Sequence, residues 1–330
     1  MAKLKATIKE RIKDRVRFIK KNPYLAFLLN EKKRLVFEKK MRMYSDEEYI
    51  RLLFRKSYGR EPNLENPLTF NEKLQWLKLY YRDERMAVCA DKFEVRGYLE
   101  KLGYGHLLNT LYGVYENPFE IDIDKLPENF VLKATHGSGW NIICRDKSAY
   151  DWKGWKLVMK SWLRQNLYYY GREWVYKNMK PRLICEKYLD IPEGKPFDYK
   201  FFCTNGIIQF IQVLDYSPNT FQGNLYDTGW NMMKEKYAVM GSPKNVSKPS
   251  CLDEMLKIAG DLSSAFPFAR VDLYQKEGKV IFGEITFFPG SGFFKFEPEN
   301  FDLELGGRLR LPEKNFDIKN EKSHENTIPG

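Results

Sequence analysis

Two carboxylates stand in neighbouring apolar segments of "ARVDLYQKEGKVIFGEITFFPGSGFF", residues 269–294. Asp272 and Glu284 have apolar neighbours on both sides, and the turn from Lys276 to Lys279 predicts that their two strands pair. A charge buried on an apolar strand is costly without a partner. Carboxylates are also the ligands that Mg²⁺ takes together with substrate phosphates. A shared site, either metal-bound or salt-bridged, is therefore the favoured interpretation. The alternative is that each acid faces solvent.

A lysine and a glycine-rich turn form a second candidate site in "LKATHGSGWN", residues 132–141. Lys133 leaves a predicted strand, and Gly137, Ser138 and Gly139 follow it. Glycine-rich turns can fold their N–H groups over phosphate oxygens while a lysine supplies positive charge. An ordinary hairpin also uses Gly-Ser-Gly, so this segment alone leaves both interpretations open.

A third candidate lies in "LICEKYLDIPEGKPFDYKFF", residues 183–202. Glu186 ends an apolar strand, and Glu193 follows seven residues later. Edge backbone groups beside Lys187 and Leu189 could pair with the polar edge of a purine, while the carboxylates take its amino group and a ribose hydroxyl. A strand end with solvated charges is the alternative.

Other patterns point elsewhere or are absent. The sequence has no G-x-x-x-x-G-K-[ST], G-x-G-x-x-G, H-E-x-x-H or G-x-S-x-G. Its three histidines and five scattered cysteines, none in a C-x-x-C pair, argue against zinc and suggest reduced thiols in a cytosolic protein. Asp122 and Asp124 form an Asp-x-Asp of the kind that holds Mn²⁺ and a sugar diphosphate in glycosyltransferases. They precede a Leu-Pro turn, where two exposed acids are ordinary.

The elements that position these residues change from helix to strand near residue 125. From Asp46 to about Gly105 the apolar period is helical, with Ser45 as the expected N-cap and Glu48 at the capping-box position. From Phe130 the pattern is that of strands joined by hairpins, interrupted by one helical, aromatic segment. Segregated helices and antiparallel strands predict an α+β fold. The polar residues 313–330 are expected to be frayed.

The positive charge is confined to the N-terminus. Residues 1–42 hold 15 Lys and Arg against 4 Asp and Glu, and the rest of the chain holds 40 of each, so the net charge of +11 belongs to this arm. Apolar residues recur along a basic helix that Pro23 is expected to end. The arm could anchor on an anionic membrane or pack on the body; nucleic acid is disfavoured because the body is neutral. No stretch is apolar enough to span a bilayer, and no signal peptide is present, so a cytoplasmic protein is expected.

Taken together, these motifs resemble the ATP-grasp fold of carboxylate-amine ligases of the D-alanine:D-alanine ligase type. In that family an Asp-Lys pair is followed by a lysine strand with a glycine loop, a Glu-Lys-aromatic-Leu hinge, Arg-Val-Asp, and Glu-x-Asn-x-x-Pro-Gly. The matching positions here are Asp91-Lys92, Lys133 with Gly137–Gly139, Glu186–Leu189 with Glu193, Arg270–Tyr274, and Glu284–Gly290. Thr286 stands where the family usually has its metal-binding Asn. The stretch "TFNEKLQWLKLYYRDERMAVCADKFEVRGYL" also resembles the TupA-like subfamily, which is encoded with surface-polysaccharide genes.

The resemblance implies two α+β subdomains that grip ATP, and a division of the chain into an arm (1–43), a helical region (44–125), an ATP-grasp domain (126–305) and a polar tail (306–330). It implies that Lys92, Lys133 and the Gly137–Gly139 loop hold the phosphates of ATP. It places adenosine on Glu186, Lys187, Leu189 and Glu193, and Mg²⁺ on Asp272, Glu284 and Thr286. Lys200 and Arg270 would stabilise the transferring phosphoryl group, and the loop from Pro289 to Gly292 would contact the acceptor.

The implied reaction joins a carboxylate to an amine through an acyl phosphate. The subfamily points to a uronic acid of a surface polysaccharide as the carboxylate and to an amino acid or small amine as its partner. Two alternatives remain at this point: a nucleotide-sugar glycosyltransferase, and an ATP-grasp protein that binds without catalysing.

Overall fold

The computed structural model describes residues 23–189, 197–215, 222–238 and 246–316. The chain forms two compact units, and each is assembled from separate stretches of sequence. Unit 1 comprises Met1–Met43, Thr110–Asn166 and Lys180–Tyr188; unit 2 comprises Tyr44–Asn109, Leu167–Met179 and Leu189–Gly330. The residue pattern predicts continuous segments instead. A change of pattern marks where helices give way to strands, but it does not show where the chain returns to a unit that it has already left.

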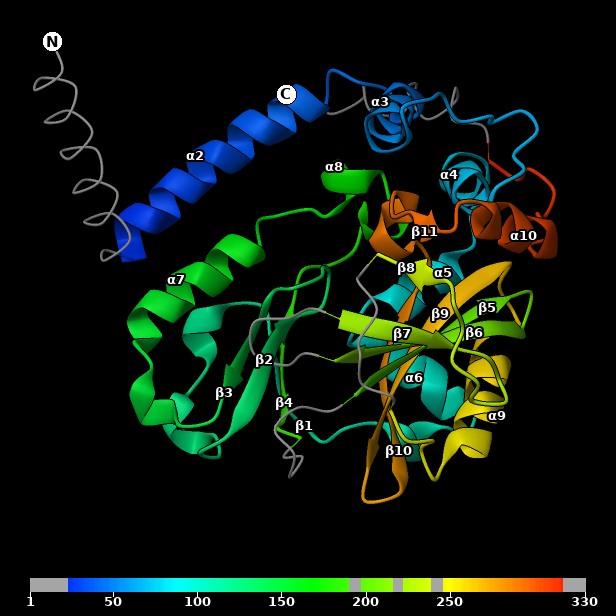
Figure 1. Ribbon diagram of the computed structural model, residues 1–330. Helices are drawn as coiled ribbons and strands as arrows, with labels where there is room; N and C mark the ends of the chain where they lie inside the picture. Colours follow the sequence, from blue (N-terminus) through cyan, green and yellow to red (C-terminus); the bar gives the residue numbers. More distant parts are fainter. Residues whose placement is uncertain (1–22, 190–196, 216–221, 239–245, 317–330) are drawn as a thin grey trace, which may run out of the picture. The chain divides into compact units, whose positions relative to one another are not determined.

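Unit 1 is built on a four-stranded antiparallel sheet in the order β1-β4-β2-β3 (Figure 1). Its strands are β1 (Leu111–Tyr115), β2 (Phe130–Ala134), β3 (Asn141–Cys144) and β4 (Leu183–Lys187). Phe130, Leu132 and Leu183 share a buried apolar cluster with Met159 and Trp162 of α7 (Trp152–Trp162). Because side chains alternate along a strand, Lys133 and Glu186 lie on the opposite face of this sheet.

The α+β prediction is confirmed, but one strand was missed. Residues 111–115 form β1, within the region that the sequence analysis assigns to helices. Three short 3₁₀ turns flank β1 along the sequence: η1 (Gly105–Leu107) before it, and η2 (Pro118–Glu120) and η3 (Ile123–Lys125) after it. "LYGVY" is too short and too glycine-interrupted to give a clear period of two, which is why the pattern does not reveal it.

The N-terminal helix of unit 1 that the structure describes is α2 (Pro23–Met41), which packs against α7. Glu31 accepts a hydrogen bond from Arg164 at 2.9 Å. Pro23 is the first residue of α2, a position where a helix needs no N–H donor. The helix that we expect Pro23 to end, with its apolar stripe, lies outside the described residues.

Unit 2 contains a five-stranded antiparallel sheet in the order β10-β9-β5-β6-β7. Its strands are β5 (Asp198–Thr204), β6 (Ile207–Asp215), β7 (Gln222–Tyr226), β9 (Phe268–Lys276) and β10 (Lys279–Thr286). Helix α9 (Leu252–Ser263) packs on β5, β6 and β9, as Figure 1 shows. The fully buried Val271 and Leu273 of β9 belong to this apolar core, so Arg270 and Asp272 lie on the other face.

The helices of residues 44–109 belong to unit 2. They are α3 (Asp46–Tyr58), α4 (Phe70–Tyr80), α5 (Glu84–Ala90) and α6 (Glu94–Lys101). The predicted capping box is confirmed: Ser45 and Glu48 satisfy each other's backbone N–H groups at the start of α3. Thr69 and Glu72 form a second such box before α4. An N-cap of this kind contributes about 1 kcal/mol to a helix.

The rest of unit 2 closes around the sheet. It consists of α8 (Tyr168–Gly171), η5 (Trp174–Tyr176), β8 (Lys236–Tyr237), η6 (Pro289–Gly292), β11 (Phe296–Glu297) and α10 (Asn300–Arg308). The short turn η4 (Lys147–Ala149) belongs to unit 1. Asn315 donates its side-chain amide to the carbonyl of Arg82 at 2.7 Å, so the described start of the expected polar tail is held in place. Residues 317–330 lie outside the description.

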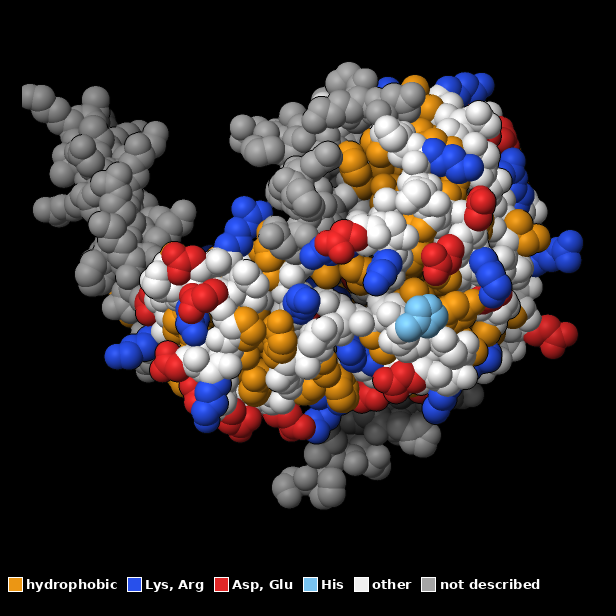
Figure 2. Space-filling model, turned by 90° about the horizontal axis from the view of Figure 1, so that it is seen from below, with side chains coloured by type: hydrophobic (Ala, Val, Ile, Leu, Met, Phe, Trp, Pro, Cys, Tyr) orange, Lys and Arg blue, Asp and Glu red, His pale blue; other side chains and the backbone are white. Residues whose placement is uncertain are grey.

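Surface charge follows the balanced composition of the body. On the face shown in Figure 2, Lys and Arg side chains are interspersed with Asp and Glu and with apolar areas. No helix among the described residues is both long enough and apolar enough to cross a bilayer.

Candidate active site

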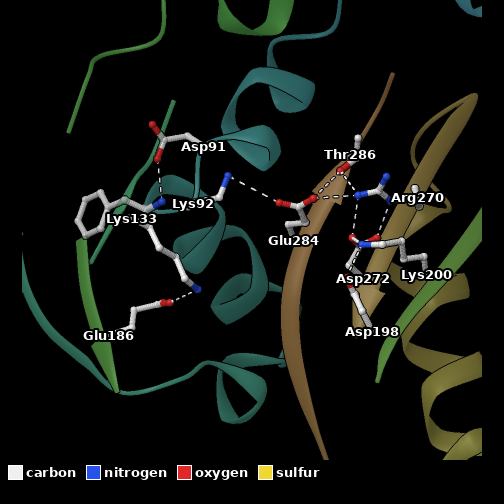
Figure 3. Close-up of polar contacts among 11 residues, drawn as sticks. Asp91, Lys92, Lys133, Glu186, Asp198, Lys200, Arg270, Asp272, Glu284 and Thr286 are labelled. Atoms are coloured by element: carbon white, nitrogen blue, oxygen red, sulfur yellow. Dashed lines mark hydrogen bonds and ion pairs between the residues drawn. The ribbon is translucent and has the colours of Figure 1, made fainter. Parts of the chain in front are cut away.

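Three side-chain oxygens converge on one nitrogen of Arg270 in unit 2 (Figure 3). Its Nη2 donates to Oδ2 of Asp272 at 2.7 Å, to Oε1 of Glu284 at 2.8 Å and to Oγ1 of Thr286 at 3.0 Å. Its Nε donates to the other oxygen of Asp272 at 2.7 Å. The three residues that the sequence analysis groups as a metal site therefore surround a single point, which the guanidinium reaches.

The register of the sheet produces this convergence. Glu284 lies directly opposite Asp272, and Thr286 directly opposite Arg270, on the paired strands β10 and β9. Lys200 of β5 lies opposite Asp272 on its other side. The predicted hairpin is confirmed, including its turn, where Glu277 and Gly278 both have positive φ as a tight two-residue turn requires.

An extra residue in β10 decides which side chains reach this face. The register shifts between Phe282 and Glu284, so Gly283 is a bulge without a partner of its own. Without the bulge, Phe282, Glu284 and Thr286 would share one face. With it, Phe282 pairs with Leu273 in the core while Glu284 pairs with Asp272. A Cβ at position 283 would meet the backbone oxygen of Asp272 at 2.8 Å, which explains the glycine.

Lys200 is buried between two carboxylates. Its Nζ lies 2.5 Å from Oδ2 of Asp198 and 2.5 Å from Oδ2 of Asp272, and the residue is only 7% exposed. The sequence analysis assigns Lys200 to the transferring phosphoryl group. In this structure its charge is already matched by Asp198, which the sequence analysis did not assign to the site.

Asp91 and Lys92 flank the same centre from the turn between α5 and α6. Asp91 accepts from the backbone N–H groups of Phe93 and Glu94, at 2.7 Å and 3.1 Å, and so starts α6. Lys92 extends toward the strands, and its Nζ lies 3.6 Å from Oε2 of Glu284. Of the predicted pair, the lysine therefore belongs to the charged centre and the aspartate supports the turn that carries it.

The electrostatics of the centre are set by three cations and three carboxylates that face one another. The cations are Lys92, Lys200 and Arg270, and the carboxylates are Asp198, Asp272 and Glu284. Burial alone would lower the pKa values of Arg270 and Lys200, but the neighbouring Asp272 carboxylate outweighs it and raises both. Burial alone would raise the pKa of Glu284, but the charges of Lys92, Arg270 and Lys200 hold that pKa well below its usual range. Glu284 is therefore firmly anionic at neutral pH.

The donor set fits a hard divalent cation. Carboxylate and hydroxyl oxygens are what Mg²⁺ prefers, and one or two carboxylates plus phosphates suffice for it. The Nη2 group of Arg270 has two N–H bonds but faces three acceptors, so the oxygens exceed what it can satisfy. Glu284 has a side chain 33% exposed, so an ion could approach it. Among the described residues there is no group of three or more His, Cys, Asp and Glu side chains that could hold a metal ion, so this centre would offer two carboxylates and a hydroxyl.

The predicted nucleotide residues of unit 1 come together in part. Nζ of Lys133 lies 2.8 Å from Oε2 of Glu186, on neighbouring strands β2 and β4. Gly137, Ser138 and Gly139 form the turn of the β2–β3 hairpin, with Gly137 buried and the other two exposed. A Cβ on Gly137 would meet the Trp140 ring at 2.3 Å, so packing accounts for that glycine.

The backbone at the end of β4 differs from the prediction. We expected edge groups beside Lys187, but β4 lies between β1 and β2, and the Lys187 N–H donates to the carbonyl of Thr110 at 2.9 Å. The prediction of a free edge there is wrong because β1 was not foreseen. Leu189 is half-buried just beyond the strand, and Glu193 lies outside the described residues.

The Asp-x-Asp of the glycosyltransferase alternative lies on the surface of unit 1. Asp122 and Asp124 are both exposed, and Asp122 forms an ion pair with Lys125 at 3.1 Å within one turn. This is the arrangement expected for two solvated acids before a turn.

A family model described as TupA-like ATP-grasp matches residues 72–310. The chain belongs to the TupA-like ATP-grasp family. The match begins within α4 and covers every described strand from β1 to β11, so the sheets of this ATP-grasp protein lie inside it. The family accounts for the α+β architecture and for the helical region that precedes the strands. No curated protein matches the chain.

Solved structures of several ligases align to part of this chain at low identity. A D-alanine–D-alanine ligase from Helicobacter pylori is 18% identical over 73% of this chain and 69% of its own, with a TM-score of 0.39. The Bacillus anthracis ligase of the same name is 18% identical over 67% and 64%, with a TM-score of 0.38. Phosphoribosylamine–glycine ligase from Thermotoga maritima is 15% identical over 62% and 48%, also at 0.38. The match thus spans less than two thirds of the last two proteins.

Proposed function

We propose that this ATP-grasp protein is an ATP-dependent ligase that joins a carboxylate to an amine through an acyl phosphate. The observation that carries the proposal is the convergence of Asp272, Glu284 and Thr286 on one nitrogen of Arg270. Phosphoryl transfer needs positioning and charge neutralisation more than covalent help from the protein. Five charged side chains on one face of the sheet, with Lys92 added from the turn between α5 and α6, support that task.

In the proposed reaction, a carboxylate oxygen attacks the γ-phosphorus of ATP and the bond to the ADP oxygen breaks. An amine then attacks the acyl carbon, the C–O bond to phosphate breaks, and an amide forms. Arg270 and Lys200 would stabilise the transferring phosphoryl group, and Arg270 the oxyanion of the acyl phosphate. Mg²⁺, held by Glu284 with Asp272 and Thr286, would neutralise phosphate charge when bound.

The nucleotide contacts in this proposal are assigned for each unit by itself. Unit 1 would contribute Lys133 and the Gly137–Gly139 turn to the phosphates and Glu186 and Lys187 to adenosine. Unit 2 would contribute Lys92 to the phosphates and Leu189 and Glu193 to adenosine. The ion pair between Lys133 and Glu186 supports a role in orienting that lysine, because a paired side chain is held in one conformation.

For the substrates, we propose a uronic acid of a capsular or related surface polysaccharide and an amino acid or small amine. The turn from Pro289 to Gly292 begins three residues after Thr286, the last residue of β10, and would contact the acceptor. The choice of a uronic acid as the carboxylate substrate is supported by the resemblance to the TupA-like subfamily.

We also propose a cytoplasmic protein held at the inner membrane surface by residues 1–42. Nine Lys and Arg among residues 1–22 support attraction to anionic lipid, worth about 1 kcal/mol for each basic residue near the surface. On α2, Leu35 and Val36 are 56% and 62% exposed beside Lys32 and Lys33, which gives this helix a mixed apolar and basic surface.

The proposed function is tested by incubating the protein with ATP, Mg²⁺, D-glucuronate or D-galacturonate, and a panel of amino acids. ADP release that depends on both a uronate and an amine supports the ligase. AMP release, or cleavage of a UDP-sugar without ATP, would contradict it; the latter outcome would favour the glycosyltransferase.

A further inference from the structure

Glu173 is a buried carboxylate of unit 2 that the proposed reaction leaves without a role. It lies between α8 and η5 and is 7% exposed. Its Oε1 accepts a short hydrogen bond from the hydroxyl of Ser291, which is its one hydrogen-bond donor within the described residues. Ser291 belongs to the turn that we propose contacts the acceptor, so this carboxylate lies behind that turn.

The turn holds the Ser291 hydroxyl toward Glu173 at a cost in backbone energy. Ser291 has φ 53°, between Gly290 at 56° and Gly292 at 65°. A left-handed conformation costs a residue with a Cβ about 1–2 kcal/mol, and such strain persists where the surroundings impose it. Here Gln75 of α4 imposes it, because its side-chain amide donates to the carbonyls of Ser291 at 3.1 Å and Gly292 at 2.8 Å.

Lys78 supplies a positive charge on the same side of the turn. Its Nζ lies 2.9 Å from Oε1 of Gln75, 2.7 Å from the carbonyl of Gly171 and 2.6 Å from the carbonyl of Ser291. Burial lowers the pKa of Lys78 to about 7, while Glu173 acts to raise it. A neutral amine has only two N–H bonds, so three acceptors require the ammonium form. A cation here favours an anionic Glu173.

The charges around Glu173 suit a group that takes up a proton. Burial raises its pKa, and Lys78, Ser291 and Arg270 oppose that shift. Burial, and after it the charges of Glu173 and Glu284, raise the pKa of Tyr176 of η5 well above its usual value, while Arg270 opposes this shift. Glu173 thus lies close enough to the phosphoryl centre to share its electrostatic field, with a proton affinity above that of an ordinary carboxylate.

We propose that Ser291 and Glu173 form a proton relay that deprotonates the incoming amine. The inference rests on the proposed function, because it supplies a step that the ligase reaction needs: an ammonium group has no lone pair with which to attack. Ser291 Oγ accepts one proton from the ammonium group while its own hydroxyl proton passes to Oε1 of Glu173. The amine lone pair then attacks the acyl carbon, and the electron pair of the broken C–O bond leaves with phosphate, which takes the second amine proton.

Other buried carboxylates of unit 2 are less suited to this step. Both oxygens of Asp272 accept from Arg270, and Glu284 has a lowered pKa, which makes it a weak base. Asp302 of α10 accepts from the backbone N–H and the side-chain amide of Asn71, both at 3.0 Å. It is therefore committed to the start of α4.

The test compares two nucleophiles. Hydroxylamine is largely unprotonated at neutral pH, so it traps an acyl phosphate as a hydroxamate without a base, whereas an amino acid must first lose a proton. With ATP, Mg²⁺ and D-galacturonate or D-glucuronate, Glu173→Gln should lower amide formation with amino acids by about 100-fold or more, the lower range of general base catalysis. Its hydroxamate formation should equal that of the unaltered protein.

Ser291→Gly is the second variant, because glycine removes the hydroxyl and tolerates the left-handed backbone. It should show the same selective loss even if Glu173→Gln folds poorly. Asp302→Asn, another buried acid of unit 2, is the matched control and should keep both activities. Equal loss of both activities in Ser291→Gly, or unchanged amide formation in either relay variant, would overturn the relay. Failure of the unaltered protein to form any hydroxamate would instead contradict the proposed function.

Discussion

Arg270 holds both oxygens of Asp272, two residues further along the same strand, with Nε and Nη2 each at 2.7 Å. The same Nη2 reaches Glu284 on the neighbouring strand at 2.8 Å. A guanidinium thus occupies the point at which the predicted metal ligands meet. The negative charges of the buried acids are balanced by cationic side chains of the protein itself. A metal ion bound with ATP would therefore have to share or displace some of these contacts.

Glu284 should be essential for turnover but not for folding. Glu284→Gln removes the charge of a partly exposed carboxylate that accepts from Arg270, so ATP turnover should fall to background while circular dichroism stays unchanged. Glu277→Gln, in the exposed turn of the same hairpin, is the matched control and should keep full turnover. Normal turnover in Glu284→Gln would contradict the metal assignment.

Lys200 should contribute strongly to stability. Lys200→Met removes the buried cation that contacts both Asp198 and Asp272, and breaking a buried ion pair in this way typically costs about 3–5 kcal/mol. Urea unfolding measures the change. The double variant Asp198→Asn/Lys200→Met should recover part of it, whereas Lys279→Met, at an exposed strand start, should be nearly neutral. A loss below about 1 kcal/mol in Lys200→Met would show that the pair is not buried as described.

The contribution of Glu284 to stability should vanish in acid. Its pKa is lowered in the folded protein from the ordinary 4.5, so folding favours the ionised form. The stabilising contribution is therefore complete above that ordinary value and is lost as the pH falls from it toward the lower folded value. Unfolding free energies of the unaltered protein and Glu284→Gln should differ at pH 7 and converge as the pH is lowered through about 4. A difference independent of pH would rule out this linkage.

Thr286 should set the magnesium requirement. Thr286→Asn restores the side-chain amide oxygen that the ATP-grasp family usually has, and it should lower the Mg²⁺ concentration for half-maximal ADP release. Thr286→Val removes the oxygen and should raise it by about 10-fold or more, since even outer-shell partners of a metal change affinity by that factor. If both variants behave like the unaltered protein, Thr286 is not a ligand.

The basic N-terminus should bind anionic membranes. Removal of residues 1–22 keeps α2, and with it the Glu31–Arg164 contact, so the body should stay folded. The shortened protein should lose binding to phosphatidylserine-containing vesicles, and the full chain should lose it as salt is raised. Neutral phosphatidylcholine vesicles are the control. Equal binding of both chains to the anionic vesicles would contradict the anchor.

Local patterns were enough to predict the parts of the fold that depend on near neighbours. The Ser45–Glu48 capping box and the β9–β10 hairpin follow from residues only a few positions apart, and both are confirmed. The turn alone would pair Asp272 with Gly283, and the bulge at Gly283 moves the pairing to Glu284. Contacts between distant segments were not predictable in this way, because one sequence does not say which elements become neighbours.

Asp198 and Glu173 illustrate what was missed. Asp198 lies in a segment that was singled out, but its role depends on Lys200 being buried beside Asp272, 72 positions away. Glu173 lies in an aromatic segment without a recognisable motif, and its partner Ser291 is 118 positions further on. The one available signal was a lone acid in "GREWVY", which is too common to interpret.

The most direct test of the central claim follows oxygen from substrate to product. With a uronate labelled by ¹⁸O in its carboxyl group, ATP, Mg²⁺ and an amino acid, an acyl phosphate intermediate must carry one carboxyl oxygen into the released phosphate. The proposed ligase predicts phosphate that contains one ¹⁸O for each amide formed. Amide formation with unlabelled phosphate, or label appearing in AMP, would contradict it.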